Sequence, residues 1–360
     1  MRNVVCRIGL NSLSMLLLSS VLFAQEPSDR FKRLDRDGNG FLTPDELPEA
    51  IRGNFNRVDR NRDGRISPAE DAAVLQRNGG RRRELPEGVK KIGDIPYVEN
   101  GHERQVLDLY LPESTGKPRP LVLWIHGGAW RAGDKNSGPW MPLLEKGFVV
   151  ASMNYRLSQH ATFPAQIEDC KAAVRWLRQH AKEYEIDPDH FGAWGSSAGG
   201  HLVALLGTSG DVPELEGTRD IDVSSRVQAV CDWFGPTDFS LMNQQAGDNG
   251  TIDHDAPEAP EAQLIGGPVQ ERPDLVKRAS PLTYVTPDDP VFLIVHGDQD
   301  TLVPVQQSQM LQAALEEAKV SSTLIIVPGA GHGQFGDPKI TERCVEFFVD
   351  QLQKPTGTEK

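Results

Sequence analysis

Short apolar runs alternate with helical stretches from about residue 96 to residue 353, and this alternation constrains the fold of the chain most strongly. Most of the runs are near-continuous, which is typical of strands that helices bury on both faces. The predicted strands are residues 105–111, 121–128, 148–155, 190–197, 227–235, 291–298 and 322–331. The pattern predicts an α/β fold with a mostly parallel sheet, whose chemistry lies at the carboxyl ends of the strands.

The sequence GSSAG, at residues 195–199, lies where a predicted strand ends and a helix-forming stretch begins. It fits the pattern G-x-S-x-G only around Ser197, because Ser196 would be flanked by Trp194 and Ala198. At a strand-to-helix junction this motif forms a sharp turn that exposes a nucleophilic serine. We therefore predict that Ser197 is a nucleophile and that Ser196 is a packing neighbour.

A serine hydroxyl needs a base to take its proton and an acid to orient that base. His332 is the predicted base, because it lies in a glycine-flanked loop after the last predicted strand. Asp298 and Asp300 both follow the preceding strand, and Asp300 is favoured as the acid because it lies further into the loop. Asp238 remains a third choice. The order Ser197, Asp300, His332 is the order expected for this kind of fold.

His126 and His296 each end an apolar strand directly before a glycine. We expect them to make hydrogen bonds within the turn and not to act as the base.

The sequence HGGAW, at residues 126–130, follows a predicted strand. The backbone N–H groups of Gly127 and Gly128, together with that of Ala198, are the predicted oxyanion hole. Such donors stabilise the negative oxygen that forms when a serine attacks a carbonyl group. Trp130 is predicted to line the acyl pocket.

Two stretches, DRDGNGFLTPDE at residues 35–46 and DRNRDGRISPAE at residues 59–70, repeat one pattern. Each has oxygen donors at loop positions 1, 3, 5, 7, 9 and 12 and a glycine at position 6, which is the set that Ca²⁺ prefers. The predicted ligands are Asp35, Asp37, Asn39, Phe41, Thr43 and Glu46 in the first loop, and Asp59, Asn61, Asp63, Arg65, Ser67 and Glu70 in the second. Both loops resemble the EF-hand family. One short helix near residues 47–58 must link them, so we expect a small structural calcium module.

The first residues carry arginines and then an apolar run that ends near Ala24, which predicts an export signal and a periplasmic or secreted protein. No later segment is apolar enough to span a bilayer. The formal net charge of -13 argues against a nucleic-acid partner. The expected organisation is a signal peptide at residues 1–24, an EF-hand pair at 25–76, a linker at 77–94, an α/β domain at 95–353 and a tail at 354–360.

Three cysteines follow the predicted signal, and each lies in an apolar helix or strand pattern. We expect Cys170, Cys231 and Cys344 to be buried thiols, and the sequence leaves open whether two of them form a bridge.

Seven segments fall in the order found in one enzyme family: HGGAWRAGDK, NYRLS, FPAQIEDCKAAVRWLR, WGSSAGGHL, DWFGPTDF, HGDQDTLVP and GAGHG. Between Ile95 and Gln353 the chain resembles the α/β-hydrolase esterases of the bacterial feruloyl esterase-like, hormone-sensitive-lipase-related group. The resemblance implies an α/β-hydrolase fold and hydrolysis of short acyl or aryl esters, including acyl groups on polysaccharides, without a catalytic cofactor. Ala129 departs from the related H-G-G-G motif and narrows the space beside its amide.

The sequence therefore predicts an exported serine carboxylic-ester hydrolase with a Ser-His-Asp triad, an acyl-enzyme and a calcium-binding N-terminal module. Its partners are expected to be small-molecule or polysaccharide esters. One alternative is an amidase or peptidase with the same triad. Another is a calcium-dependent surface-attachment protein. The sequence does not indicate the acyl group, the alcohol or a protein partner of the calcium module.

Overall fold

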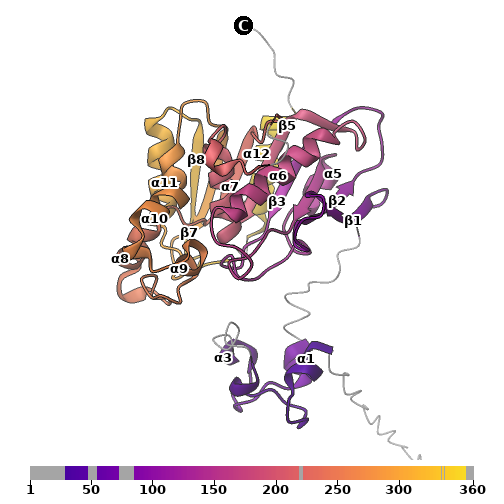
Figure 1. Cartoon of the computed structure of the whole chain (residues 1–360). Coiled ribbons are helices and arrows are strands. Elements are labelled where there is room, and N and C mark those ends of the chain that lie inside the picture. The colour runs from indigo at the N-terminus through magenta and orange to yellow at the C-terminus, as the bar shows by residue number, and fades with distance from the viewer. Residues whose placement is uncertain are drawn as a thin grey trace, which may run out of the picture. The chain divides into compact units, whose positions relative to one another are not determined.

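The computed structural model describes residues 29–47, 55–72, 85–218, 222–333, 335 and 337–353. The chain divides into two compact units, one that ends at Glu84 and one that begins at Leu85 (Figure 1). The predicted signal peptide, the predicted tail and residues 77–84 of the predicted linker lie outside the described residues. Among the described helices, none has both the length and the apolar character needed to cross a bilayer.

The larger unit is built on an eight-stranded sheet with the order β1-β2-β4-β3-β5-β6-β7-β8. The strands are β1 (Lys90–Pro96), β2 (Val106–Leu111), β3 (Arg119–Ile125), β4 (Val149–Met153), β5 (Ile186–Ser196), β6 (Ala229–Trp233), β7 (Val291–Gly297) and β8 (Ser322–Val327). The pairs β1–β2 and β2–β4 are antiparallel, and the other pairs are parallel. The predicted mostly parallel sheet is confirmed.

Helices cover both faces of this sheet (Figure 1). In β3, Leu121 and Leu123 belong to one buried apolar cluster, whereas Val122 and Trp124 belong to another. Side chains of a strand alternate between faces, so both faces of β3 are buried. This explains why the apolar runs in the sequence are continuous.

Each cluster has its own helices. The first cluster takes side chains from α6 (Ala165–Gln179), α7 (Ala198–Thr208) and α11 (Gln306–Glu317). The second takes them from α5 (Met141–Glu145) and α12 (Pro338–Leu352). The sheet is therefore fixed from both sides, which holds the carboxyl ends of its parallel strands in place.

Short helices precede and follow β6: the first lies between α7 and β6, and the others lie between β6 and β7. They are η2 (Pro213–Leu215), η3 (Phe239–Leu241), α8 (Met242–Ala246), η4 (Gly247–Asn249), α9 (Pro260–Ile265), η5 (Val269–Glu271), α10 (Pro273–Ala279) and η6 (Pro281–Tyr284). The segment between β6 and β7 contacts the loop after β7. The amide of Thr251 donates to Thr301 O at 3.1 Å, and His254 Nε2 lies 3.1 Å from Leu302 O.

Strand β1 differs from the sequence-based expectation, because it begins at Lys90, inside the predicted linker 77–94. Most of its side chains are exposed, and it pairs only with β2 at the edge of the sheet. An edge strand with a mostly polar sequence has no continuous apolar run, so its pattern does not stand out from that of a linker.

The predicted cysteine environment agrees with the structure. Cys170 on α6, Cys231 on β6 and Cys344 on α12 are buried free thiols. The indole Nε1 of Trp233 donates to Cys344 Sγ at 3.2 Å, so this thiol is part of the packing between β6 and α12.

The smaller unit contains α1 (Asp29–Leu34), η1 (Pro44–Glu46) and α3 (Phe55–Val58). Leu42 and Ile66 form an antiparallel bridge with backbone hydrogen bonds of 2.9 and 2.8 Å. This bridge joins the two predicted calcium loops. Among its described residues, the buried apolar side chains form one cluster: Phe31, Leu42, Leu47, Phe55 and Ile66. Only residues 55–58 of the predicted linking helix are described as helix, since residues 48–54 lie outside the described residues.

Candidate active site

Ser197 lies between the last residue of β5 and the first residue of α7. Its backbone has φ 56° and ψ -122°, a conformation that residues other than glycine rarely adopt. Its amide donates to Trp233 O on the neighbouring strand at 2.8 Å. The serine therefore occupies a sharp strand-to-helix turn at the carboxyl edge of the sheet.

The two glycines of the motif are required by close backbone contacts. A Cβ at Gly195 would lie 2.2 Å from the carbonyl oxygen of Gly199. A Cβ at Gly199 would lie 2.1 Å from the carbonyl oxygen of Ile125 on β3. Any side chain at either position would push the turn away from the sheet, so these glycines set the position of Ser197.

His332 lies within hydrogen-bonding distance of both other residues of the predicted triad. His332 Nε2 is 2.9 Å from Ser197 Oγ, and His332 Nδ1 is 2.7 Å from Asp300 Oδ2. The imidazole follows β8 and packs edge-on against Phe234, with ring centroids 4.6 Å apart. This arrangement can transfer a proton from the hydroxyl to the imidazole while the carboxylate holds the other ring nitrogen.

The carboxylate of Asp300 is fully buried and remains charged. Its Oδ1 accepts hydrogen bonds from the amides of Leu302 and Val303, both at 2.9 Å. Burial alone would raise the pKa of this carboxyl, but hydrogen bonds from His296 and His332 outweigh burial and hold the pKa well below its usual range. A permanent negative charge therefore faces His332.

The other carboxylates considered in the sequence analysis have different partners. Asp298 is exposed, and its Oδ1 accepts a hydrogen bond from the amide of Gly329 at 2.7 Å. Asp238 caps η3 by accepting from the amide of Ser240 at 2.9 Å. Among the described residues, Asp300 is thus the carboxylate that contacts His332.

The loop after β3 brings the predicted oxyanion residues to the serine. A Cβ at Gly127 would lie 2.7 Å from Ser196 O and 3.2 Å from Ser197 Cβ, so this glycine lies directly beside Ser197. Gly128 has φ 116°, and a Cβ there would lie 2.4 Å from Ala132 O. Ala198 is the first residue of α7 and follows the serine. Gly127 and Ala198 thus lie beside Ser197, and Gly128 is the next residue of the loop.

Trp130 ends this loop segment, and its side chain is 2 % exposed. It packs edge-on against His201 on α7, with ring centroids 5.2 Å apart, and against Phe239, at 5.5 Å. The indole therefore packs between the loop after β3 and α7, the helix that follows Ser197. Its predicted contact with an acyl group stays a prediction.

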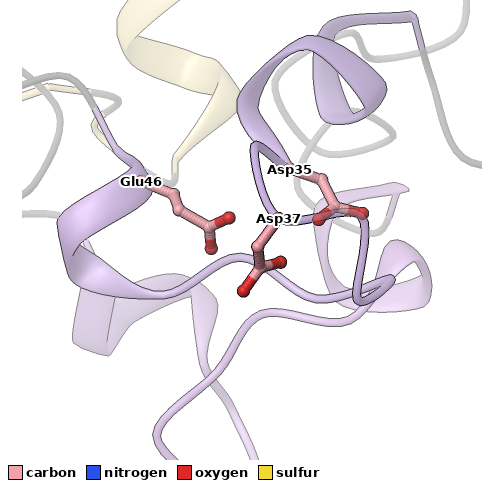
Figure 2. A group of neighbouring side chains, drawn as sticks. All are labelled: Asp35, Asp37 and Glu46. Atoms are coloured by element: carbon pink, nitrogen blue, oxygen red, sulfur yellow. The ribbon is translucent and has the colours of Figure 1, made fainter.

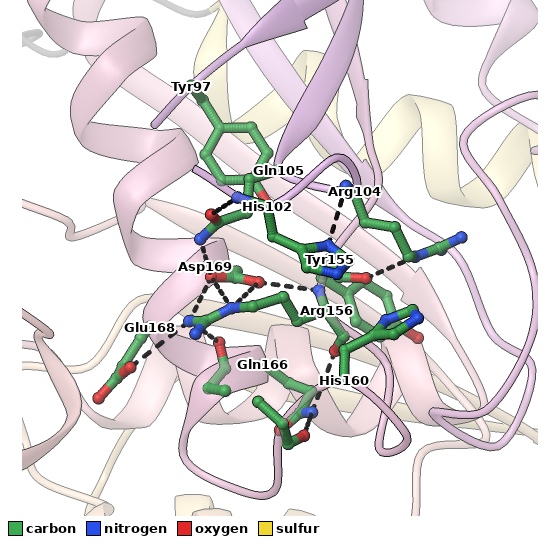
Figure 3. A network of polar contacts seen from close by, with 12 residues as sticks. Tyr97, His102, Arg104, Gln105, Tyr155, Arg156, His160, Gln166, Glu168 and Asp169 are labelled. Atoms are coloured by element: carbon green, nitrogen blue, oxygen red, sulfur yellow. Dashed lines mark hydrogen bonds and ion pairs between the residues drawn. The ribbon is translucent and has the colours of Figure 1, made fainter. Parts of the chain in front are cut away.

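Arg104, a residue that the sequence analysis missed, contacts the loop after β3, and Figure 3 shows its contact with Tyr155. Arg104 donates to Tyr155 O at 2.8 Å and to Gly133 O at 3.0 Å, and its Nη2 lies 3.2 Å from His126 Nε2. An arginine can only donate, so His126 accepts at Nε2 and donates from Nδ1 to Gly127 O at 2.7 Å. Burial lowers the pKa of His126 to about 4, which keeps the ring neutral. His126 thus bonds within its turn, as expected.

The segment that carries Tyr155 is itself fastened to α6 (Figure 3). Arg156 contacts the buried carboxylate of Asp169 through its backbone amide at 2.8 Å and its guanidinium at 2.7 Å. Gln105 donates to the same carboxylate at 2.7 Å. Tyr155 Oη then donates to His126 O at 3.0 Å. The motif NYRLS drew attention to this segment through the family resemblance, but its spacing gave no indication of these partners.

The first predicted calcium loop gathers three carboxylates (Figure 2). One oxygen each from Asp35, Asp37 and Glu46 lies within 4.8 Å of the others. The amide of Gly40 donates to Asp35 Oδ2 at 2.9 Å, and the hydroxyl of Thr43 donates to Glu46 Oε2 at 2.9 Å. These hydrogen bonds hold the carboxylates on one side of the loop. The backbone amide of Thr43 lowers the pKa of Glu46, so this group stays ionised.

The second loop repeats the same contacts. The amide of Gly64 donates to Asp59 Oδ2 at 2.9 Å, and the hydroxyl of Ser67 donates to Glu70 Oε2 at 2.7 Å. Asn39 in the first loop and Asn61 in the second each donate to a neighbouring aspartate, at 2.7 and 3.0 Å. Two copies of one loop geometry therefore flank the Leu42–Ile66 bridge.

Comparison with known proteins assigns the larger unit to a protein family. The BD-FAE family model matches residues 107–315, which is more than half of the chain. The chain belongs to the BD-FAE family. The matched span includes Ser197 and Asp300 and ends before His332, so this family assignment does not depend on the predicted base. An EF-hand model matches residues 28–48 and 54–70, in agreement with the two predicted loops.

Curated relatives of this BD-FAE member are named as esterases. Esterase LipQ of Mycobacterium tuberculosis is 33% identical over 250 residues, which covers 67% of this chain and 57% of LipQ. The probable carboxylic ester hydrolase LipM of the same organism is 34% identical over 230 residues, which covers 60% of this chain and 50% of LipM. The chain thus spans between half and two thirds of the length of these relatives. The predicted resemblance to esterases is confirmed.

Solved structures agree. A truncated carbohydrate esterase from gut microbiota is 37% identical with a TM-score of 0.68, and the match covers 74% of this chain and 97% of that one. A bifunctional GH43-CE protein from Bacteroides eggerthii is 35% identical with a TM-score of 0.68, covering 73% of this chain and 35% of that one. The predicted α/β-hydrolase fold of the BD-FAE unit is confirmed.

Proposed function

We propose that the chain is a serine carboxylic-ester hydrolase. The observation that carries this proposal is the hydrogen-bonded series from Ser197 Oγ through His332 to Asp300, with distances of 2.9 and 2.7 Å. Membership of the BD-FAE family and similarity to named esterases support it. The strained elbow and the adjacent glycine loop are further support, because a serine without a catalytic role has no need of either.

The reaction follows from the positions of these groups. Ser197 Oγ bonds to the ester carbonyl carbon while its proton passes to His332 Nε2, and Asp300 stabilises the resulting imidazolium. The N–H groups of Gly127, Gly128 and Ala198 hold the negative oxygen. The bond to the alcohol then breaks, and the alcohol leaves with the proton from His332. Water, with His332 again as the base, releases the acid from the acyl-enzyme and restores the serine.

We propose short acyl and aryl esters as the substrates, including acyl groups carried by polysaccharides. Two structural neighbours support the carbohydrate part of this proposal. One is the truncated carbohydrate esterase. The other is an acetyl ester-xyloside bifunctional hydrolase from Caldicellulosiruptor lactoaceticus, which is 27% identical with a TM-score of 0.58.

A substrate panel tests the proposed reaction. We expect turnover of 4-nitrophenyl acetate and release of acetate from acetylated xylan, and no turnover of an aminoacyl 4-nitroanilide above the uncatalysed rate. The alcohol of an ester leaves with little protonation, whereas the nitrogen of an amide is a poor leaving group and must be protonated before it leaves. Absorbance at the nitrophenolate and nitroaniline bands measures the first and third reactions, and enzymatic acetate determination measures the second. Preferential turnover of the anilide would replace the esterase proposal with the amidase alternative.

We also propose that the two loops of the smaller unit bind Ca²⁺. One carboxylate oxygen each of Asp35, Asp37 and Glu46 lies within 4.8 Å of the others. Without a cation between them, these three negative charges repel one another. Carboxylate, amide and hydroxyl oxygens are the donors that a hard cation prefers. The match of both loops to the EF-hand model supports the same ligand in each. Bound calcium would stabilise the smaller unit by neutralising these charges.

Calorimetric titration of the full chain with CaCl₂ measures this binding. We expect a dissociation constant of about 10⁻⁴ to 10⁻³ M, the range of extracellular modules. Glu46→Gln removes one charged donor and is expected to weaken one of the two sites about tenfold or more. Asp45→Asn is the matched control, because it removes the neighbouring exposed charge, which is not a predicted ligand. Equal effects of the two substitutions would contradict the assignment of Glu46.

A further inference from the structure

A second histidine contacts the buried carboxylate of the triad. His296 on β7 has no exposed surface, and its Nε2 lies 3.2 Å from Asp300 Oδ2. The same nitrogen lies 2.8 Å from Val303 O. The other nitrogen, Nδ1, lies 2.7 Å from the hydroxyl oxygen of Ser308 on α11. The sequence analysis expected only a turn hydrogen bond at this histidine.

These contacts define which nitrogen of His296 carries a proton. Asp300 Oδ2 and Val303 O are both acceptors, so a lone pair at Nε2 would face two negative atoms. Nε2 therefore donates. In a neutral ring Nδ1 is then a bare acceptor, and the hydroxyl of Ser308 can donate to it. Ser308 thus fixes the tautomer in which His296 donates toward the carboxylate.

We propose that His296, held in this tautomer by Ser308, is a positioning residue that orients Asp300 toward His332. The proposal rests on the esterase function proposed above. The backbone amides of Leu302 and Val303 donate to Asp300 Oδ1. His296 Nε2 donates to Val303 O and also lies 3.2 Å from Oδ2, the oxygen that His332 contacts. With both oxygens held, the plane of the carboxylate is set and points at His332 Nδ1.

The donation also has an electrostatic effect. Two imidazole nitrogens face the negative charge of Asp300 Oδ2: His332 Nδ1 at 2.7 Å and His296 Nε2 at 3.2 Å. Without His296 more of this charge would face His332 and favour its protonated form. Among the described residues, Asp232 on β6 is a second carboxyl that interacts with His296, and burial raises the pKa of Asp232 to about 6. A pH profile must therefore separate His332 from Asp232.

The test compares kcat, KM and the pH profile of kcat/KM for 4-nitrophenyl acetate in several variants. We expect His296→Leu to lower kcat about 10- to 100-fold with little change in KM, because a misplaced catalytic group costs rate more than binding. We expect its acid limb to move up by about 0.5 to 1 pH unit. His296→Gln, which offers a side-chain N–H near the position of Nε2, should restore part of both effects. Asp232→Asn should leave the limb in place.

Ser308→Ala tests whether the serine acts through the histidine. We expect a smaller change in the same direction in the wild-type background and no further change in the His296→Leu background, because a residue that acts only through another is not additive with it. His190→Gln is the matched control, since His190 also contacts a carboxylate, Asp187 at 2.9 Å, but lies near the amino-terminal half of β5.

Titration with a fluorophosphonate counts the correctly folded sites, so that a loss of folded protein is not read as a loss of rate. A normal acid limb and kcat in His296→Leu, with full reactivity of Ser197 in the wild type, would overturn the positioning role alone. Absence of fluorophosphonate labelling and of ester turnover in the wild type would instead overturn the proposed function.

Discussion

Replacing Ser197 with alanine is expected to lower kcat for 4-nitrophenyl acetate by about 10⁴- to 10⁶-fold, to the level that the oxyanion donors and binding alone can sustain. The hydroxyl oxygen is the atom that bonds to the substrate, and its proton passes to His332 Nε2, which lies 2.9 Å away. Alanine has neither this oxygen nor this proton. No acyl-enzyme could form. Burst kinetics with the nitrophenyl ester and mass spectrometry of the trapped acyl-enzyme measure the loss directly.

Ser196→Ala is the control for this substitution. It removes a hydroxyl from the adjacent residue, which ends β5 with ordinary strand geometry, and is expected to change kcat less than about threefold, as surface and near-surface changes usually do. Alanine at position 197 must adopt the same φ of 56°, so thermal melting of both variants shows whether the elbow is retained. Equal losses in the two variants with intact melting curves would show that Ser197 is not the nucleophile.

The sequence predicted well those features that depend on residues close together in the chain. Ser197 could be selected because two glycines lie close to it in the chain. The structure gives the reason for these glycines, since a Cβ at either position would lie only 2.2 or 2.1 Å from a backbone oxygen. The two EF-hand loops could be found for the same reason, since all the predicted donors of a loop lie within twelve consecutive positions. Burial on both faces made the central strands visible as continuous apolar runs.

Residues whose role depends on distant contacts could not be found in this way. Arg104 precedes β2, yet it contacts the loop after β3 and the segment after β4. His296 has the position of a turn residue and does bond to Val303 O, but its contact with Ser308 depends on how α11 packs against the sheet. Edge strand β1 was missed because its exposed side chains carry no apolar pattern. Tertiary packing, and not local propensity, decides these three cases.

Replacing Asp300 with asparagine is expected to lower kcat by about 10⁴-fold with a smaller change in KM. The amide oxygen would take the place of Oδ1, which accepts from Leu302 and Val303. The NH₂ group would then take the place of Oδ2, face His332 Nδ1 and donate to it, while His296 Nε2 keeps Val303 O as its acceptor. His332 would carry its proton on Nε2 and could not accept the proton of Ser197. The geometry would survive while the tautomer is wrong, so a crystal structure or a melting curve would show little change beside the large loss of rate.

Asp298→Asn distinguishes this mechanism from a general loss of negative charge near the site. Asp298 lies two residues earlier in the same loop, is exposed, and accepts a hydrogen bond from the amide of Gly329 that asparagine can also accept. We expect its kcat to stay within about twofold of the wild type, because a solvated charge contributes little. If both substitutions lowered kcat to the same extent, the charge of the loop and not the contact with His332 would be what supports catalysis. A large loss of kcat at position 300 alone would show that catalysis depends on the carboxylate that lies 2.7 Å from His332 Nδ1. Of the two aspartates, Asp300 is the one whose contact sets the tautomer of His332.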